Sequence, residues 1–168
     1  MNKIYYIIIA CIVVLLAGTL VYFGVFGADR LTPDPKVETI QLYYYNPAKD
    51  TDSAGNILCS SLGLVAVERQ ISQSNTFVQD VIEELLSGQL TSVEKDRGIA
   101  TEFPLSGFRL EGVLLDNGEL TLTFSDSQNR TVGGACRVGI LWMQIEATAK
   151  QFPEVKEVRF QPEELFQP

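Results

Sequence analysis

The stretch "GFRLEGVLLDNGELTLTF", residues 107–124, decides the fold class of this chain. Runs of alternating apolar and polar residues lie on both sides of Asp116-Asn117-Gly118, and Asn-Gly is a strong signal for a two-residue β-turn. The stretch therefore predicts a β-hairpin, so the fold contains at least one antiparallel strand pair.

On the C-terminal side of this hairpin, the sequence "TVGGACRVGILWMQIEATAKQF", residues 131–152, is strongly apolar. Its apolar residues recur at intervals of three or four, among them Val138, Leu141 and Ile145. This spacing predicts a helix over about residues 134–151. A strand is predicted at residues 155–160, after a break at Pro153.

On the N-terminal side, residues 72–88 also follow a helical period, and Gly88 marks the end of that helix. The β-type runs at residues 39–45 and 62–71 predict two more strands. Residues 94–98, "EKDRG", predict a surface turn.

The resulting order is β-β-α-β-β-α-β. It predicts an α+β fold, a two-layer sandwich in which one mixed β-sheet carries both helices on one face.

Several segments in this order together resemble one known family: "IQLYYYN", "VIEELLSG", the hairpin of residues 107–124, Gly133-Gly134, and "TAKQFPEVKEVRF". The set is similar to the sporulation and spore germination domain called GerMN, over about residues 38–162. The resemblance implies an exported domain, membrane-anchored or lipidated, without established catalytic residues. It also implies an interaction role, because some members resemble ring-building modules of envelope machines. This chain differs in having one copy instead of a tandem pair, and in its cysteines.

The N-terminal segment differs in character from the rest of the chain. From Ile4 to Phe26 there are 23 residues without a charge. As a helix they would reach about 34 Å, enough for a hydrocarbon core of about 30 Å. This favours an uncleaved transmembrane signal-anchor. The alternatives are a cleaved signal peptide, which normally has a shorter apolar region, and a lipoprotein signal ending at Cys11.

Positive charge precedes the apolar segment, at Lys3 and the terminal amine. This favours an N-terminus inside the cell and a C-terminal domain outside the cytoplasm, in a single-pass protein of the cell membrane. The bilayer would contact residues 4–26. The expected division of the chain is a signal-anchor helix at 1–28, a linker at 29–38, a GerMN-like domain at 39–162 and a C-terminal tail at 163–168.

Charge and composition exclude several functions. The chain has no histidine and a formal net charge of −8. Without histidine, the Ser-His-Asp and Cys-His arrangements and the HExxH zinc site are excluded. An acidic surface repels nucleic acid, so no nucleic-acid partner is expected.

Two acidic segments suggest metal binding or catalysis. Residues 50–56, "DTDSAGN", begin like a calcium loop but lack ligands at the fifth and twelfth positions. Asp80, Glu83 and Glu84 would suit the paired carboxylates of glycan hydrolysis, but they lie opposite the apolar stripe of their helix. We predict a polar loop and a solvated helix face, and therefore no catalytic residue, metal or cofactor.

Cys59 and Cys136 lie outside the apolar N-terminal segment. In an oxidising compartment two such thiols are expected to form a disulfide. The chain-entropy model gives such a bond about 4 kcal/mol of stabilisation. Two independent buried thiols are the alternative.

Gly133 and Gly134 open the predicted last helix. Phosphate-binding loops need a lysine after the glycines or a GxGxxG directly after a strand, and neither pattern is present. We expect a helix-entry turn. The alternative is an anion site that uses the helix N-terminus and Arg137.

Three aromatic residues are candidates for contact with a partner or ligand. Alternation along residues 43–45 turns Tyr43 and Tyr45 outward, where they would suit a glycan or a partner strand. Trp142 is expected to pack against the sheet or, if exposed, to anchor a partner.

Together these features predict a non-catalytic protein-interaction or assembly module of the bacterial cell envelope. Its partner would be an envelope protein or a second copy of the chain. The alternatives are a cell-wall glycan-binding module and, less favoured, a carboxylate-dependent hydrolase.

Overall fold

The computed structural model describes Lys3 and residues 8–9, 12–16 and 36–167. The chain divides into two units, Met1–Lys36 and Val37–Pro168, and each is described by itself.

In the first unit, Lys3 and residues 8–9 and 12–16 are helical. Within the described part of the chain, no helix is both long enough and apolar enough to cross a membrane. Most of the predicted span at residues 4–26 and of the linker at 29–38 lies outside the described residues.

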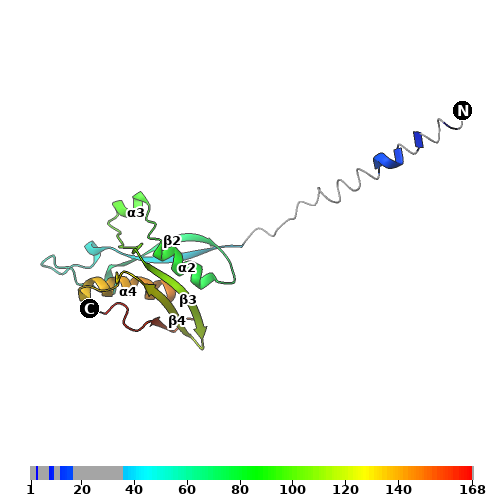
Figure 1. Ribbon diagram of the computed structural model, residues 1–168. Coiled ribbons are helices and arrows are strands. Elements are labelled where there is room, and N and C mark those ends of the chain that lie inside the picture. The colour runs from blue at the N-terminus through cyan, green and yellow to red at the C-terminus, as the bar shows by residue number, and fades with distance from the viewer. Residues whose placement is uncertain (1–2, 4–7, 10–11, 17–35, 168) are drawn as a thin grey trace. The chain divides into compact units, whose positions relative to one another are not determined.

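The second unit is an α+β domain, which confirms the predicted class (Figure 1). Its main elements are β1 (Val37–Tyr45), β2 (Leu64–Ser72), α2 (Phe77–Leu86), α3 (Ser92–Asp96), β3 (Phe108–Asp116), β4 (Glu119–Asp126), α4 (Ala135–Ala149) and β5 (Glu157–Gln161). The order matches β-β-α-β-β-α-β except for the additional helix α3.

The hairpin of residues 107–124 forms as predicted. Strands β3 and β4 are antiparallel, and Asp116 pairs with Glu119 across the turn. Asn117 and Gly118 both have positive φ, 52° and 94°, as a type I′ turn requires. Strand β5 then pairs with β4 in parallel, from Glu119 opposite Glu157 to Thr123 opposite Gln161.

The expectation of one mixed sheet is wrong, because β1 and β2 form a separate two-stranded antiparallel sheet beside the three-stranded sheet β3-β4-β5. Side chains at the end of α4 and just after it occupy the second edge of β1. The Gln41 N–H donates to Gln151 Oε1 at 2.9 Å, and the Tyr43 N–H donates to Thr148 Oγ1 at 3.0 Å. These helix contacts take the place of a neighbouring strand.

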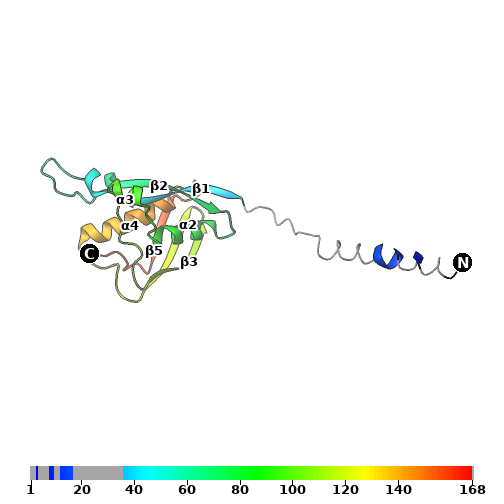
Figure 2. The ribbon, with the colours of Figure 1, turned by 90° about the horizontal axis from the view of Figure 1, so that it is seen from above.

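Helices α2 and α4 lie between the β1–β2 pair and strand β3 (Figure 2). The core side of β4 carries Leu120, Leu122 and Phe124, all buried. The helices contribute buried residues to the same core, namely Val81, Ile82, Leu85, Leu141, Ile145 and Ala149. Among the described residues, the core lies between Ile40 and Phe166, counting those packed at its margin. Residues 37–168 therefore contain a complete core, and we expect them to fold without the preceding segment.

Helix α3 replaces the predicted surface turn at residues 94–98. Thr91 caps this helix, because its hydroxyl accepts from the Glu94 N–H while the Glu94 side chain accepts from the Thr91 N–H. Glu94 is only 9% exposed and forms a two-pronged ion pair with Arg69 on β2, with N–O distances of 2.7 and 2.8 Å. The charge of Glu94 thus serves tertiary structure, which the local sequence pattern did not reveal.

Candidate functional site

Helix α4 is tied to a distant loop at its first turn. Cys59, in the loop of residues 46–63, forms a disulfide with Cys136, as the sequence predicted. The two Cα atoms are 5.2 Å apart. The bond therefore holds this loop, hereafter the 46–63 loop, against the start of α4.

The two glycines lie where α4 begins. Gly134 is the N-cap residue, with extended φ and ψ of −64° and 148°, and no side chain caps the helix there. Arg137 is engaged within the protein, because its guanidinium pairs with Glu102 at 2.6 Å and donates to the Arg130 and Val132 carbonyl oxygens. This geometry matches a helix-entry turn, and it occupies the cation that the anion-site alternative required.

The prediction that Tyr45 points into solvent is wrong. It is 5% exposed, since the 46–63 loop folds over it, and its hydroxyl donates to Asp50 Oδ2. Burial, together with this bond, raises the pKa of Tyr45 to about 12. Tyr44 is also buried, on the opposite side of β1, and Tyr43 is half-buried with its hydroxyl donating to Gln41. The outward tyrosine pair proposed for glycan stacking is therefore absent from β1.

Asp50 is the centre of the polar network inside the 46–63 loop. Besides the Tyr45 hydroxyl, its carboxylate accepts the N–H and the hydroxyl of Ser60, each at 2.6 Å. Burial raises the pKa of Asp50, but the hydrogen bonds from Ser60 and Tyr45 outweigh this and lower it overall. Asp52 accepts from Ala54 and Asn56 in the same loop. Both carboxylates are used in shaping the loop.

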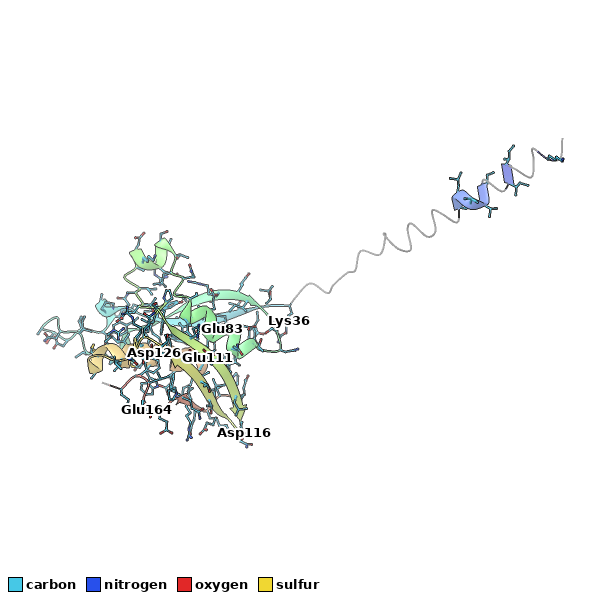
Figure 3. The ribbon with its side chains drawn as sticks, viewed as in Figure 1. Lys36, Glu83, Glu111, Asp116, Asp126 and Glu164 are labelled. Atoms are coloured by element: carbon cyan, nitrogen blue, oxygen red, sulfur yellow. A yellow bond between two sulfur atoms is a disulfide. The ribbon has the colours of Figure 1, made fainter. Side chains whose placement is uncertain are left out.

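Two of the acidic residues considered for catalysis form local hydrogen bonds. Asp80 accepts from Ser74 and Thr76, and Glu83 accepts from Gln79. Figure 3 shows Asp116 at the tip of the β3–β4 hairpin, apart from Asp126 and Glu164. Within the described residues, no cluster of three or more Cys, Asp or Glu side chains could hold a metal ion.

Trp142 lies on an aromatic surface that the sequence revealed only in part. Trp142 is 40% exposed, and its ring centroid is 6.3 Å from that of Phe160 on β5. Phe160 in turn contacts Phe166 at 5.4 Å, so the C-terminal tail packs back onto the domain. A hollow of about 330 Å³ lies here, lined by Trp142, Arg159, Phe160, Glu163, Leu165, Phe166 and Gln167. We call this the Trp142 surface.

A second hollow opens on another side of α4. It measures about 190 Å³ and is lined by Tyr45, Pro47, Ala100, Thr101, Glu102, Ile140, Leu141 and Gln144. We call it the Gln144 cleft. No sequence pattern indicated this cleft, because its lining residues come from three stretches that are far apart in the sequence.

Comparison with known families identifies the domain. Residues 41–164 match the family Germane, described as sporulation and spore germination. The chain belongs to this family, which confirms the predicted GerMN assignment. No curated protein matches the chain.

Solved structures of GerMN domains are similar to this chain. The tandem GerMN domains of the sporulation protein GerM from Bacillus subtilis show 19% identity and a TM-score of 0.49. That match covers 82% of this chain and 43% of the other, so this chain spans less than half of its length. The first GerMN domain of the same protein shows 16% identity and a TM-score of 0.48, covering 76% and 86% of the two chains.

Proposed function

We propose that this protein is a non-catalytic interaction module of the cell envelope, which docks an envelope protein or a second copy of itself through the Trp142 surface. The observation that carries the proposal is the exposure of Trp142 beside Phe160 and Phe166. Exposed tryptophan beside a hollow is typical of residues that dominate binding energy. Arg159 and Glu163 border the same hollow and provide the polar rim common in protein interfaces.

A non-catalytic role agrees with the chemistry of the described side chains. Two of the three carboxylates considered for hydrolysis, Asp80 and Glu83, are engaged in local hydrogen bonds, and the chain has no histidine to serve as a general base. The glycan-binding alternative relied on the aromatic or acidic surface of the domain, and the burial of Tyr45 removes the outward tyrosine pair from that support.

Site-specific photo-crosslinking in native membranes tests the docking surface. A photoreactive phenylalanine analogue at position 142 should capture one defined protein. The matched control is the same analogue at Leu114, which is 64% exposed on β3. Capture at both positions, or at neither, would contradict docking through the Trp142 surface.

An assay of retention on purified cell-wall sacculi distinguishes glycan binding from protein docking. We expect residues 37–168 to stay in solution in this assay. Retention that is lost in Trp142→Ala would assign the same surface to glycan instead of protein.

We also propose that residues 4–26 anchor the domain in the cell membrane, with the N-terminus inside and the domain outside the cytoplasm. The support is the run of 23 uncharged residues after Lys3. Protease added to cells stripped of their wall should degrade the domain while a cytoplasmic marker survives. Survival of the domain until lysis would overturn this topology.

A further inference from the structure

The Gln144 cleft has the size and lining of a site for one small ring. Its volume is about 190 Å³. For scale, an apolar cavity of about 150 Å³ is large enough to hold benzene. The ring of Tyr45 and the aliphatic side chains of Pro47, Ile140 and Leu141 supply apolar walls. An apolar ring would therefore fit the cleft.

Gln144 introduces an unsatisfied acceptor into this apolar lining. The residue is fully buried at 0% exposure. Its Nε2 donates to the Ile140 carbonyl oxygen at 3.2 Å, whereas its Oε1 has no hydrogen-bond partner among the described residues. Turning the amide over would place Oε1 against the Ile140 carbonyl oxygen, so the orientation is defined by this contact. A buried acceptor without a donor is costly, and a ligand that supplies the donor would remove that cost.

The polar groups near Gln144 do not supply this donor. The Tyr45 hydroxyl donates to Asp50, and the Arg137 guanidinium donates to Glu102. Thr101 and Glu102 add further oxygen atoms to the lining. The cleft therefore favours a ligand with an O–H or N–H group.

We propose that the Gln144 cleft opens locally and binds an aromatic ring that carries an O–H or N–H donor, with the donor directed to Gln144 Oε1, which is enclosed in the free domain. The ring has two possible sources, a free phenol or indole, or a tyrosine side chain of another protein. This site is independent of the docking proposed above. Trp142 lies two residues from Gln144 on α4, which places the two side chains about 160° apart around the helix.

A pair of matched probes tests the proposal. p-Cresol and toluene differ only by the hydroxyl group, and a purely apolar cleft would prefer toluene. We expect residues 37–168 to bind p-cresol severalfold more tightly than toluene in an NMR titration, with shifts at Ala100, Ile140 and Gln144. A preference for toluene, equal affinities, or no binding of either probe would overturn the proposal.

Gln144→Met provides the second arm, because it keeps the side-chain volume and removes the acceptor. The order of affinities should reverse in this variant, so that toluene binds more tightly than p-cresol. Gln79→Met, the same change on α2 outside the cleft, should keep the wild-type order. If Gln144→Met fails to fold, the order of the two probes on the wild type still decides the outcome.

Capped tyrosine distinguishes the two sources. If N-acetyl-tyrosinamide binds and N-acetyl-phenylalaninamide does not, the cleft accepts a ring attached to a polypeptide. If p-cresol binds and both capped amino acids are excluded, the cleft accepts only a free ring. Either result retains the ring-and-donor proposal. Binding of the phenylalanine derivative as tightly as the tyrosine derivative would contradict it.

Discussion

The two antiparallel strand pairs of this domain differ in the connection between their strands. Strands β3 and β4 are joined by Asn117 and Gly118 alone, both with positive φ. Strands β1 and β2 are joined by the 46–63 loop, which is held by the disulfide to α4 and by hydrogen bonds around Asp50. The short hairpin is specified by its own residues, whereas the long one depends on partners elsewhere in the chain.

The comparison teaches where single substitutions should matter. A two-residue turn can be weakened only at its own backbone, so a substitution there should lower the free energy of unfolding only slightly. The long hairpin has several separate anchors, at Cys136, Asp50 and Glu94, and loss of one anchor exposes previously buried polar groups or lengthens a free loop. The four substitutions below test this difference in order of decreasing effect.

The disulfide should have the largest effect. Replacing Cys59 and Cys136 together by serine should lower the free energy of unfolding by about 4 kcal/mol, the chain-entropy value for a loop of 77 residues. Guanidinium unfolding of residues 37–168 measures this change. Reductant should shift the wild type toward the variant and leave the variant unchanged. A loss below about 1 kcal/mol would mean that the 46–63 loop is held without the bond.

Glu94→Gln should have the next largest effect, because Arg69 would lose its charged partner. The hydrogen bonds from Arg69 lower the pKa of Glu94 from 4.5 to about 2, against the opposing effect of burial. Since both side chains keep some contact with solvent, we expect a loss of about 2 kcal/mol at neutral pH. Glu83→Gln on the exposed face of α2 is the control and should change stability by less than about 0.5 kcal/mol.

The Arg69–Glu94 ion pair also predicts how the free energy of unfolding changes at acidic pH. A carboxyl whose pKa is lowered by folding contributes fully above its unfolded value of about 4.5, and the contribution is lost as the pH falls toward 2. The difference in unfolding free energy between the wild type and Glu94→Gln should therefore shrink steadily from pH 5 to pH 2. A difference that stays constant over this range would show that the ion pair does not stabilise the fold.

Tyr45→Phe should cost about 1.5 kcal/mol, because it removes the buried hydroxyl that donates to Asp50. Tyr43→Phe is the matched control two residues away. Its hydroxyl donates to Gln41 in an exposed setting, so its loss should be within about 0.5 kcal/mol. Thermal unfolding of both variants side by side measures the difference. Equal losses would contradict the role assigned to the Tyr45–Asp50 bond.

Gly118→Ala should have the smallest destabilising effect, about 1 kcal/mol. Its φ of 94° disfavours a side chain, and a Cβ atom would lie 2.9 Å from Cδ of the flexible Lys156. Gly139→Ala on α4 should act in the opposite direction and stabilise by up to about 1 kcal/mol, because its site is helical and open. Destabilisation of both variants to the same extent would refute the assignment of strain to the turn.

Much of the fold could be predicted from local patterns. Asn117-Gly118 specified the hairpin, and apolar spacing located α2 and α4, because these signals act within a few residues. Helix α3 also had a local signal, since Thr91 and Glu94 form the T-x-x-E pattern of a capping box. The charged residues 94–98 favour a surface turn instead, so two local signals conflict in this segment.

The separation of the two sheets had no local signal. It depends on Thr148 and Gln151, which reach the edge of β1 from more than 100 residues away. The burial of Tyr45 and the Gln144 cleft likewise arise only when segments distant in sequence meet. The disulfide between Cys59 and Cys136 is also a long-range feature, but it could be predicted from the sequence. A cysteine can form a disulfide only with another cysteine, so few pairings were possible.

Trp142 also makes this domain a reporter of its own contacts. It is the single tryptophan of the chain, so intrinsic fluorescence excited near the red edge of protein absorption comes from one position. In the free domain the indole is partly hydrated, and a protein that covers it would shift its emission toward the blue. The extent of that shift offers a direct titration signal for any candidate partner without adding a label.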